Sequence, residues 1–300
     1  MTPLKILLRL EETVGIDGRP RRLISALEVE LHTFFGLPPL QAAERAEQVA
    51  PAVARLIDQR SHEAERSGVV ATLVLIGAAS DSVAGTCHVL PTDALPLSAV
   101  KEGRLNARDL LTAIQGLDYS QFERFGRRVL FELGATDARV TKHAGDQGID
   151  FYGHLSVGAL MALPTPFFRL AHEVRLSFAG QAKHYPTSTI GPNVVRELIG
   201  SVALARTKTF SAETDDLFEG SHIKPFSPVM PLLFTTGKVS RGAYALSDAA
   251  GIVVKSGEQI ATFLADLRVG IDPATSKFNS ALFSDWLADE RLPAAVERHV

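Results

Sequence analysis

The sequence predicts an α/β fold, with a mixed central sheet flanked by helices and a mostly helical N-terminal domain before it. Two observations carry this prediction. From about residue 117 onward, short β-branched or apolar runs alternate with amphipathic helical patterns, as in a sheet covered by helices. Residues 1–116 show mostly helical periodicity. We therefore expect an N-terminal domain over residues 1–116, an α/β domain over 117–270 and a helical tail over 271–300.

In the N-terminal domain the pattern predicts helices from Arg22 to Phe35 and from Gln41 to Arg66, because apolar residues recur there at helical spacing. The run from Val69 to Ile76 is either a buried strand or a core helix, and periodicity does not distinguish the two. Two short helices are expected at Asp93–Val100 and Asn106–Leu117. We find no motif here to which a chemical step can be assigned.

The α/β domain begins with a helix from Tyr119 to Leu133. Asp118 and Gln121 form the pattern of a capping box at its start. Its apolar residues are expected to face inward, namely Phe122, Val129, Leu130 and Leu133. Its three arginines, Arg124, Arg127 and Arg128, are expected to face outward. Glu123 lies at the margin of the buried face.

Five strands and three further helices are predicted after this helix. The strands are Ala138–Lys142, Ile149–Val157, Glu173–Lys183, Val229–Thr235 and Ile252–Lys255, and the helices are Asn193–Thr207, Ser240–Ala250 and Glu258–Leu267. Leu160–His172 is predicted to be an insertion between two strands, and Ser211–Pro228 an irregular stretch. The tail is expected to form one or two amphipathic helices around Trp286.

Composition restricts where the protein works. A single cysteine, Cys87, excludes an internal disulfide and favours a reducing compartment, so we expect a cytoplasmic protein. The longest apolar run, Gly68–Ala79, is too short to cross a membrane.

Residues 116–270 carry a net charge of +1, whereas residues 1–115 and 271–300 carry −2 each. Any contact with nucleic acid must therefore come from a local patch and be sensitive to salt.

One group of polar residues indicates a chemical site. Side chains two apart in a strand point to the same face, so Gln181 and Lys183 should project together. If the strand after Asp150 is their neighbour, a carboxylate, an amide oxygen and an ammonium converge. Mg²⁺ prefers oxygen ligands, and a lysine beside it can orient water or offset phosphate charge. The set suits metal-dependent attack on a phosphodiester.

The order of these residues resembles the Mrr-type restriction endonuclease domain, over about residues 118–267. That family belongs to the PD-(D/E)xK nucleases, in the branch where Gln replaces the second acidic residue. The matching positions are Phe122-Glu123, Gly134, Val140-Thr141, Gly145-Asp146-x-Gly148-x-Asp150, Gln181-x-Lys183 and Leu233-Phe234-Thr235-Thr236-Gly237. The resemblance implies a restriction-endonuclease-like sheet.

The resemblance also implies an activity and a set of site residues. The expected activity is Mg²⁺-dependent hydrolysis of DNA, with Mn²⁺ as a substitute, in restriction or defence against phage. Asp150, Gln181, Lys183 and Glu123 are the expected catalytic residues, and Asp150, Gln181, Ala182 and Glu123 the expected metal ligands. Gln181 leaves the site one negative charge short, which Glu123 can restore. Glu123 can alternatively pair with Arg127 on the helix surface.

Three further expectations concern the turn at Asp146, the partners and the alternatives. Asp146 either shapes its turn or binds metal through water, and Gly148 permits a backbone conformation closed to other residues. A homodimer is expected, because two sites can then cut two strands. The N-terminal domain is expected to bind DNA, a partner protein or a second subunit. Two other functions stay open: a nuclease acting on junctions or flaps, and a catalytically silent DNA-binding module with the same fold.

Overall fold

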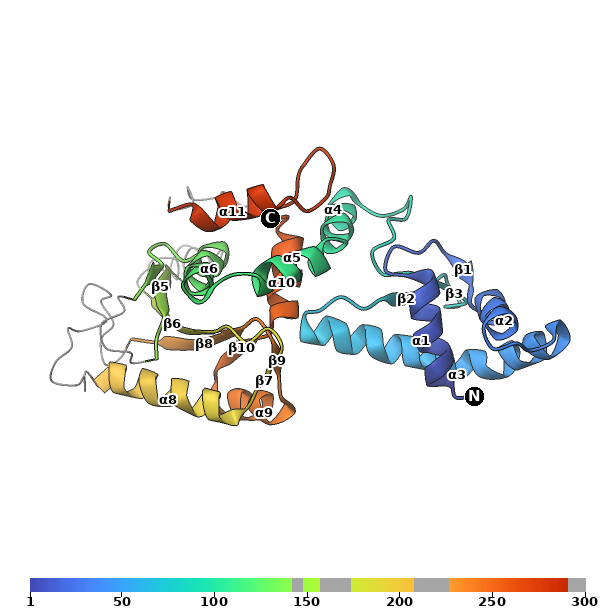
Figure 1. The fold of residues 1–300 in the computed structure, drawn as a ribbon, viewed down its shortest axis with the longest axis horizontal. Helices are drawn as coiled ribbons and strands as arrows, with labels where there is room; N and C mark the ends of the chain where they lie inside the picture. Colours follow the sequence, from blue (N-terminus) through green and yellow to red (C-terminus); the bar gives the residue numbers. More distant parts are fainter. Residues whose placement is uncertain (142–147, 157–173, 208–226, 291–300) are drawn as a thin grey trace, which may run out of the picture. The chain divides into compact units, whose positions relative to one another are not determined.

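A computed structural model describes residues 1–141, 148–156, 174–207 and 227–290. The chain forms two compact units. The first comprises residues 1–110 with 261–282, and the second residues 111–260 with 283–300 (Figure 1). The domain limits expected at residues 116 and 270 differ from this division and remain predictions. Among the described residues, no helix is both long enough and apolar enough to cross a membrane.

Three helices build the core of the first unit: α1 (Pro3–Val14), α2 (Leu23–Thr33) and α3 (Pro39–Ser67). Their apolar faces meet in one cluster that includes Leu7, Leu10, Leu27, Leu31, Ala46 and Val53. The predicted helices at residues 22–35 and 41–66 are thereby confirmed. Helix α1 was not predicted, although Thr2 caps it by accepting a hydrogen bond from Lys5 N.

The first unit also contains a small antiparallel sheet in the order β1-β3-β2. Its strands are β1 (Arg21–Arg22), β2 (Leu73–Ile76) and β3 (Ser82–Gly85). The alternative left open for residues 69–76 is thus decided in favour of a strand. Helix α4 (Leu95–Arg104) follows, and Arg104 donates two hydrogen bonds of 2.6 and 2.8 Å to Asp266. That pair ties α4 to a segment far along the chain.

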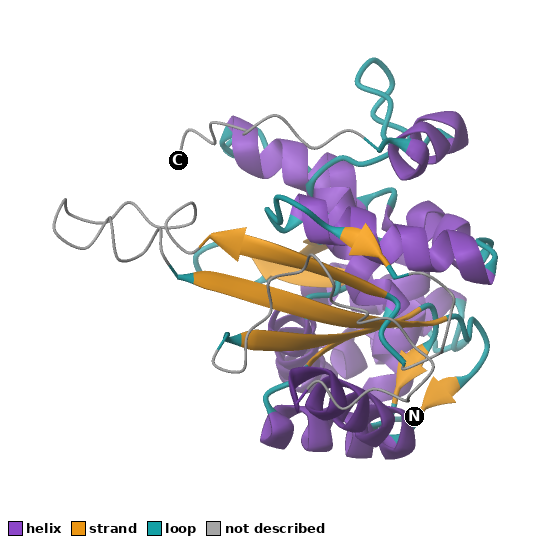
Figure 2. Ribbon diagram, turned by 90° about the vertical axis from the view of Figure 1, so that its left-hand side faces the viewer, coloured by secondary structure: helices purple, strands orange, loops and turns teal. Residues whose placement is uncertain are grey.

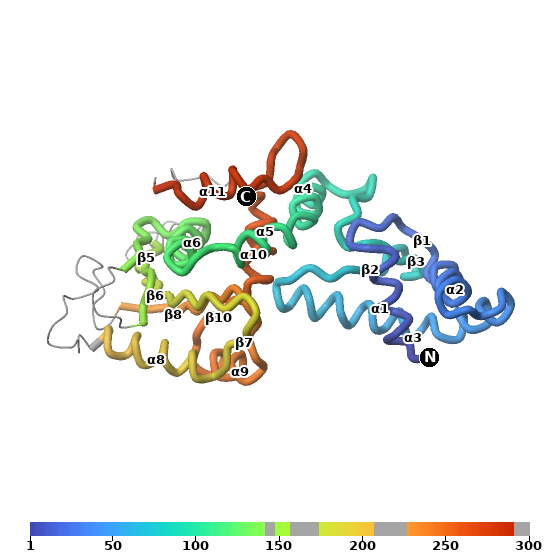
Figure 3. Tube along the Cα trace, in the orientation of Figure 1, coloured from blue at the N-terminus to red at the C-terminus, as the bar shows by residue number. Residues whose placement is uncertain are grey.

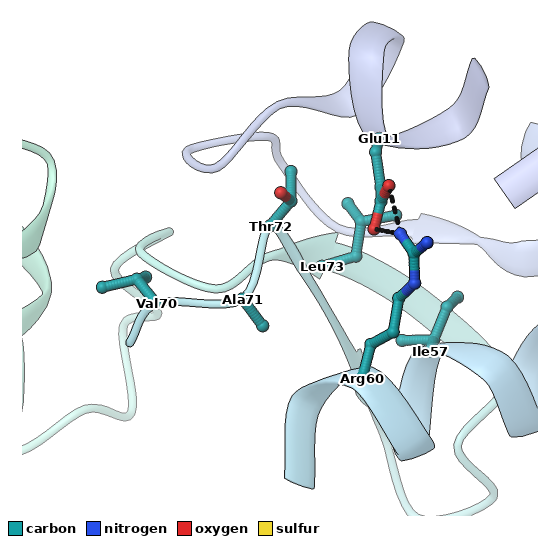
Figure 4. A pocket seen from close by; sticks show the side chains of 7 residues that line it. All are labelled: Glu11, Ile57, Arg60, Val70, Ala71, Thr72 and Leu73. Carbon is teal, nitrogen blue, oxygen red and sulfur yellow. Dashed lines mark hydrogen bonds and ion pairs between the residues drawn. The ribbon is translucent and has the colours of Figure 1, made fainter. Parts of the chain in front are cut away.

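A pocket of about 210 Å³ lies within the first unit, between α3 and the segment leading into β2 (Figure 4). Glu11, Ile57 and Arg60 line one side, and residues 70–73 the other. Arg60 Nη1 lies 2.7 Å from both oxygens of the Glu11 carboxylate, so the charged groups lining this pocket already neutralise each other. None of the predicted catalytic residues lines it.

The second unit is built on a five-stranded sheet in the order β10-β8-β6-β5-β4, whose strands lie side by side in Figure 2. The strands are β4 (Arg139–Val140), β5 (Phe151–Ser156), β6 (Arg175–Lys183), β8 (Val229–Thr235) and β10 (Val253–Lys255). Strands β6, β8 and β10 run parallel, whereas β5 is antiparallel to both β4 and β6. The predicted mixed sheet is confirmed.

Helices cover both faces of this sheet (Figure 1). Helix α6 (Tyr119–Glu132) packs against β5 and β6 on one face. On the other, α8 (Pro192–Thr207) and α9 (Arg241–Ala250) pack on each other, and their buried residues join those of the strands in a single cluster. The described residues also form helices α5 (Ala107–Gln115), α10 (Gly257–Asp266) and α11 (Ser280–Ala288), and a short parallel pair of strands, β7 (Thr189–Ile190) and β9 (Lys238–Val239).

A close approach of β5 to β6 depends on Gly180. The Phe151 ring is fully buried and stacks on Phe234, with ring centroids 5.3 Å apart. A Cβ at position 180 would lie 2.0 Å from that ring, so only glycine leaves space for it. Because Phe151 directly follows Asp150, this packing fixes where the candidate carboxylate leaves the strand.

The cap and the burial of residues in α6 agree with the prediction in part and differ from it in part. The capping box forms, with Gln121 N donating to Asp118 and Asp118 N donating to the Gln121 side chain. Phe122, Val129 and Leu130 are buried as predicted and Arg124 is exposed. Two predictions were wrong: Leu133 is 38% exposed, and Arg128 is buried. Arg127 was predicted to face outward but is only partly exposed, with its guanidinium 5.4 Å from the Phe131 ring centroid.

The tail explains why Arg128 is buried. The Arg128 guanidinium lies 5.2 Å from the Trp286 ring centroid and donates to the carbonyl oxygen of Asp289. Trp286 in turn donates its indole N–H to Glu132 at 2.8 Å. Helix α11 thus covers a face of α6 that looks polar in the sequence. The predicted insertion at residues 160–172, Asp146 and nearly all of the stretch 211–228 lie outside the described residues.

Candidate active site

The site forms where β5 begins, beside the end of the antiparallel strand β6. Phe151 pairs with Gly180 in the antiparallel ladder, and Asp150 N donates to Gly180 O at 2.8 Å. The Asp150 side chain turns back onto β6, where its Oδ2 accepts a 2.7 Å hydrogen bond from Ala182 N. Asp150 is only 7% exposed. The strands are therefore neighbours, as the convergence of Asp150 with Gln181 and Lys183 required.

The chain entering β5 is held in place by two residues. Gly148 has a φ of +70°, which confirms the predicted need for glycine, and a Cβ there would lie 2.6 Å from Ser201 Oγ. Thr141 Oγ1 donates to Ile149 O at 2.7 Å. The backbone on the N-terminal side of Asp150 is thereby packed against α8 and tied to the residue after β4.

Gln181 and Lys183 share a partner that the sequence did not indicate. Gln181 Nε2 donates to Glu197 Oε1 at 3.1 Å, and Lys183 Nζ lies 2.9 Å from the same oxygen. Glu197 lies on α8, which follows β6 and β7 and whose path along the strands can be traced in Figure 3. The shared partner shows that both side chains leave β6 on the α8 face, as their spacing predicted.

Charge and burial differ among these groups. Gln181 is 2% exposed, whereas the Glu197 side chain is 53% exposed and reaches solvent. The hydrogen bond from Lys183 lowers the pKa of the Glu197 carboxyl below its ordinary value, although partial burial opposes this effect. The two groups therefore form an ion pair at neutral pH, at the boundary between protein and solvent.

The oxygen of the Gln181 amide is the least satisfied atom of the site. Gln181 Oε1 is buried and has no hydrogen-bond partner among the residues that the structure describes. A buried acceptor without a partner costs free energy unless water or an ion completes it. With the carboxylate of Asp150, the residue directly before β5 and hydrogen-bonded to β6, the donor set consists of oxygen atoms, which fits a hard divalent cation.

The remaining candidates, Glu123 and Ala182, are both buried. Glu123 is 4% exposed within α6, deeper than the margin position predicted. Ala182 is buried in β6 and donates its N–H to Asp150. Within the described ranges, no group of three or more His, Cys, Asp or Glu side chains is arranged to hold a metal. The roles assigned to Glu123, Ala182 and the other candidates remain predictions.

Residues 114–214 match the family model described as Restriction endonuclease, the Mrr catalytic domain. The predicted resemblance is confirmed over that segment, which contains Glu123, Asp150, Gln181 and Lys183, and Glu197 as well. The match supports a DNA nuclease in restriction. It ends before residue 215, so the rest of the predicted span up to residue 267 lies beyond it.

Solved structures of restriction endonucleases show partial similarity to the chain. One is the MspJI restriction endonuclease in complex with a 27-mer oligonucleotide, with 19% identity and a TM-score of 0.38, over 69% of this chain and 41% of that one. The DNA modification-dependent restriction endonuclease AspBHI has 18% identity and a TM-score of 0.38, over 60% of this chain and 38% of the AspBHI chain. The restriction endonuclease FokI bound to DNA has 11% identity and a TM-score of 0.31, over 92% of this chain and 48% of the FokI chain. The chain thus spans less than half the length of each, and no curated protein matches it.

Proposed function

We propose that the chain is a Mg²⁺-dependent endonuclease that hydrolyses phosphodiester bonds of DNA, in a cytoplasmic restriction system directed against phage. One observation carries this proposal: Asp150, directly before β5, lies beside the adjacent strand β6, whose Gln181 has a buried amide oxygen that lacks a partner among the described residues. The match of residues 114–214 to a restriction endonuclease family supports it.

The proposal assigns the residues to two roles, metal binding and stabilisation of the reacting phosphate. Asp150, Gln181, Ala182 and Glu123 would hold the metal, and Asp150 supplies its main negative charge. When bound, Mg²⁺ supplies Lewis-acid stabilisation of the charge that develops in phosphodiester hydrolysis. Lys183 carries a positive charge at the end of β6, where it orients the attacking water and stabilises developing charge on the phosphate oxygens.

Oligomeric state is part of the same proposal. A single site of this kind cuts one strand, so two copies are needed to cut both strands in one encounter, and a symmetric pair is the commonest solution. We therefore place two copies on DNA, with the first unit binding DNA, a partner protein or the second subunit. Sedimentation velocity of the full chain checks this arrangement. A monomer that cuts both strands efficiently at low concentration would contradict it.

The catalytic proposal is tested with Asp150→Ala and Lys183→Ala. Both variants should fold, because Asp150 directly precedes β5 and Lys183 ends β6, so neither substitution removes an apolar core side chain. With plasmid and phage DNA in Mg²⁺, Asp150→Ala should lose cleavage and metal binding together. Lys183→Ala should bind metal but cleave on the order of 10²–10³ more slowly, as when a donor to an oxyanion is removed.

Matched controls come from the same unit. Asp248 on α9 and Lys255 at the end of β10, two strands from β6, are both exposed, so Asp248→Ala and Lys255→Ala remove the same charges without removing a proposed site residue. Both controls should cut DNA like the wild type. Wild-type cleavage rates in Asp150→Ala or Lys183→Ala, or no cleavage by the wild type in Mg²⁺ or Mn²⁺, would contradict the proposal.

A further inference from the structure

We infer that Glu197 is a positioning residue, which turns the Gln181 amide so that its oxygen faces the metal position and holds Lys183 beside it. The inference deepens the proposed function and rests on it, because it assigns a role to a residue of the same site. Glu197 lies outside the motif that identified the site: 13 residues separate it from Lys183.

The first argument is the orientation of the Gln181 amide. Its two ends differ chemically, since Nε2 only donates hydrogen bonds and Oε1 only accepts them. Glu197 Oε1 accepts from Nε2 at 3.1 Å, which leaves the carbonyl oxygen as the end without a partner among the described residues. If the acceptor at position 197 were lost, the amide could turn over and present its N–H groups to a cation. Only the observed orientation offers an oxygen ligand.

The second argument is the immobilisation of Lys183. A lysine side chain has many rotamers, and ordering it costs free energy. The 2.9 Å contact to Glu197 Oε1 selects one arrangement in which Lys183 leaves β6 on the same face as Gln181. One carboxylate oxygen therefore determines the geometry of a candidate metal ligand and of the candidate cationic group.

The third argument is that Glu197 is itself rigidly placed. Its neighbours on α8, Val195 and Leu198, are fully buried against the sheet. One turn later Ser201 Oγ donates to Glu197 O at 3.1 Å. Ser201 also occupies the space beside Gly148, at the start of the segment that leads into Asp150. The backbone that carries Glu197 is thus fixed relative to both strands of the site.

The test measures binding of Mn²⁺ alone, without DNA, by titration calorimetry of the full chain. Glu197→Ala removes the acceptor at a half-exposed helical position, where alanine is well tolerated. We expect Mn²⁺ affinity to fall by about 10–100-fold, the usual effect of removing a group that orients a metal ligand. Glu197→Gln keeps an acceptor oxygen and should lose less. Asp248→Asn, which removes one exposed negative charge from the same unit, should lose nothing.

A second set of variants, made in the Gln181→Glu background, distinguishes orientation of the residue 181 side chain by Glu197 from an effect of the Glu197 charge or of structural support. In Gln181→Glu both ends of the side chain are oxygen, so no orientation is needed. Removing Glu197 in that background should cost at least about fivefold less Mn²⁺ affinity than it costs beside Gln181. Equal losses in the two backgrounds would overturn the inference, as would wild-type affinity in Glu197→Ala or a loss in Glu197→Gln as large as in Glu197→Ala. Thermal unfolding of every variant verifies that it is folded.

The outcomes distinguish this inference from the proposed function. If the wild type binds Mn²⁺ but cuts no DNA, the proposed function fails, and the affinities still decide the role of Glu197. If the wild type cuts DNA and the Glu197 variants bind Mn²⁺ normally, the inference alone fails. A wild type that binds no Mn²⁺ overturns the inference whether or not it cuts DNA.

Discussion

Replacing Gln181 by Glu perturbs one of the two hydrogen bonds that link the candidate site to Glu197 on α8. The amide nitrogen lies 3.1 Å from Glu197 Oε1, so the substitution places two carboxylate oxygens at about that separation. Coulomb's law gives a repulsion of about 1.3 kcal/mol in water and about 5 kcal/mol at an effective dielectric constant of 20. The Glu197 side chain is 53% exposed and paired with Lys183, which favours the lower end. We expect the metal-free variant to be destabilised by about 1–2 kcal/mol.

Metal should reverse this loss. An added anionic oxygen strengthens binding of a hard cation, and a bound cation offsets the repulsion between the two carboxylates. Gln181→Glu should therefore melt several degrees below the wild type without metal, and gain more than the wild type in saturating Mg²⁺. Differential scanning calorimetry with and without Mg²⁺ measures both effects. The double variant Gln181→Glu/Glu197→Gln should recover the metal-free stability, since the added amide can donate to the new carboxylate.

Two results would refute this reasoning separately. An unchanged melting temperature without metal would mean that Gln181 and Glu197 do not touch in solution. A Mg²⁺ affinity no higher than that of the wild type would place Gln181 outside the metal's ligands. Cleavage need not become faster in either case, because a more strongly held metal polarises its water less freely.

Three further results are expected. Gly180→Ala should destabilise the protein by about 1–3 kcal/mol through overpacking against Phe151, whereas Gly200→Ala, with open space around it on α8, should be neutral or stabilising; urea unfolding compares them, and equal stabilities would contradict the packing. Burial raises the pKa of Cys87 to about 11, so at pH 8 iodoacetamide should modify the native thiol at least about 100-fold more slowly than the unfolded one, and fast modification of folded protein would be inconsistent with this. Lys183 lowers the pKa of Glu197 below 4.5, so their pairing stabilises the fold above pH 4.5 and is lost as the pH falls through the folded pKa; any stability advantage over Glu197→Gln at pH 7 should vanish in acid, and an advantage that grew in acid would contradict the pairing.

Features encoded by neighbouring residues could be predicted from the sequence. The capping box of Asp118 and Gln121 identified the start of α6. Helix α9 ends at Ala250 as predicted, directly before Gly251, which adopts a left-handed conformation. Strand β8 was predicted with its observed limits, because an apolar run with a turn signal after it reports a buried strand. Alternation along β6 placed Gln181 and Lys183 on one face. Each of these depends on residues a few positions apart.

Features that depend on distant residues could not be predicted. Arg128 looks like a surface residue until Trp286, far along the chain, covers it. The strands β1, β7 and β9 have two residues each, too few for a pattern, and exist only through pairing. Residues 261–282 group with the first unit through contacts such as the one between Arg104 and Asp266. Glu197 was missed for the same reason, since a lone acid on a helix is usually a solvated charge.

The most direct test of the metal site is the anomalous diffraction of crystals grown with Mn²⁺. We expect a single strong peak in each protomer, about 2.0–2.3 Å from an Asp150 carboxylate oxygen and from Gln181 Oε1, with Glu197 still bonded to Gln181 Nε2. A peak bound elsewhere, or one coordinated by Glu197 while the Gln181 amide faces away, would contradict the site proposed for this chain.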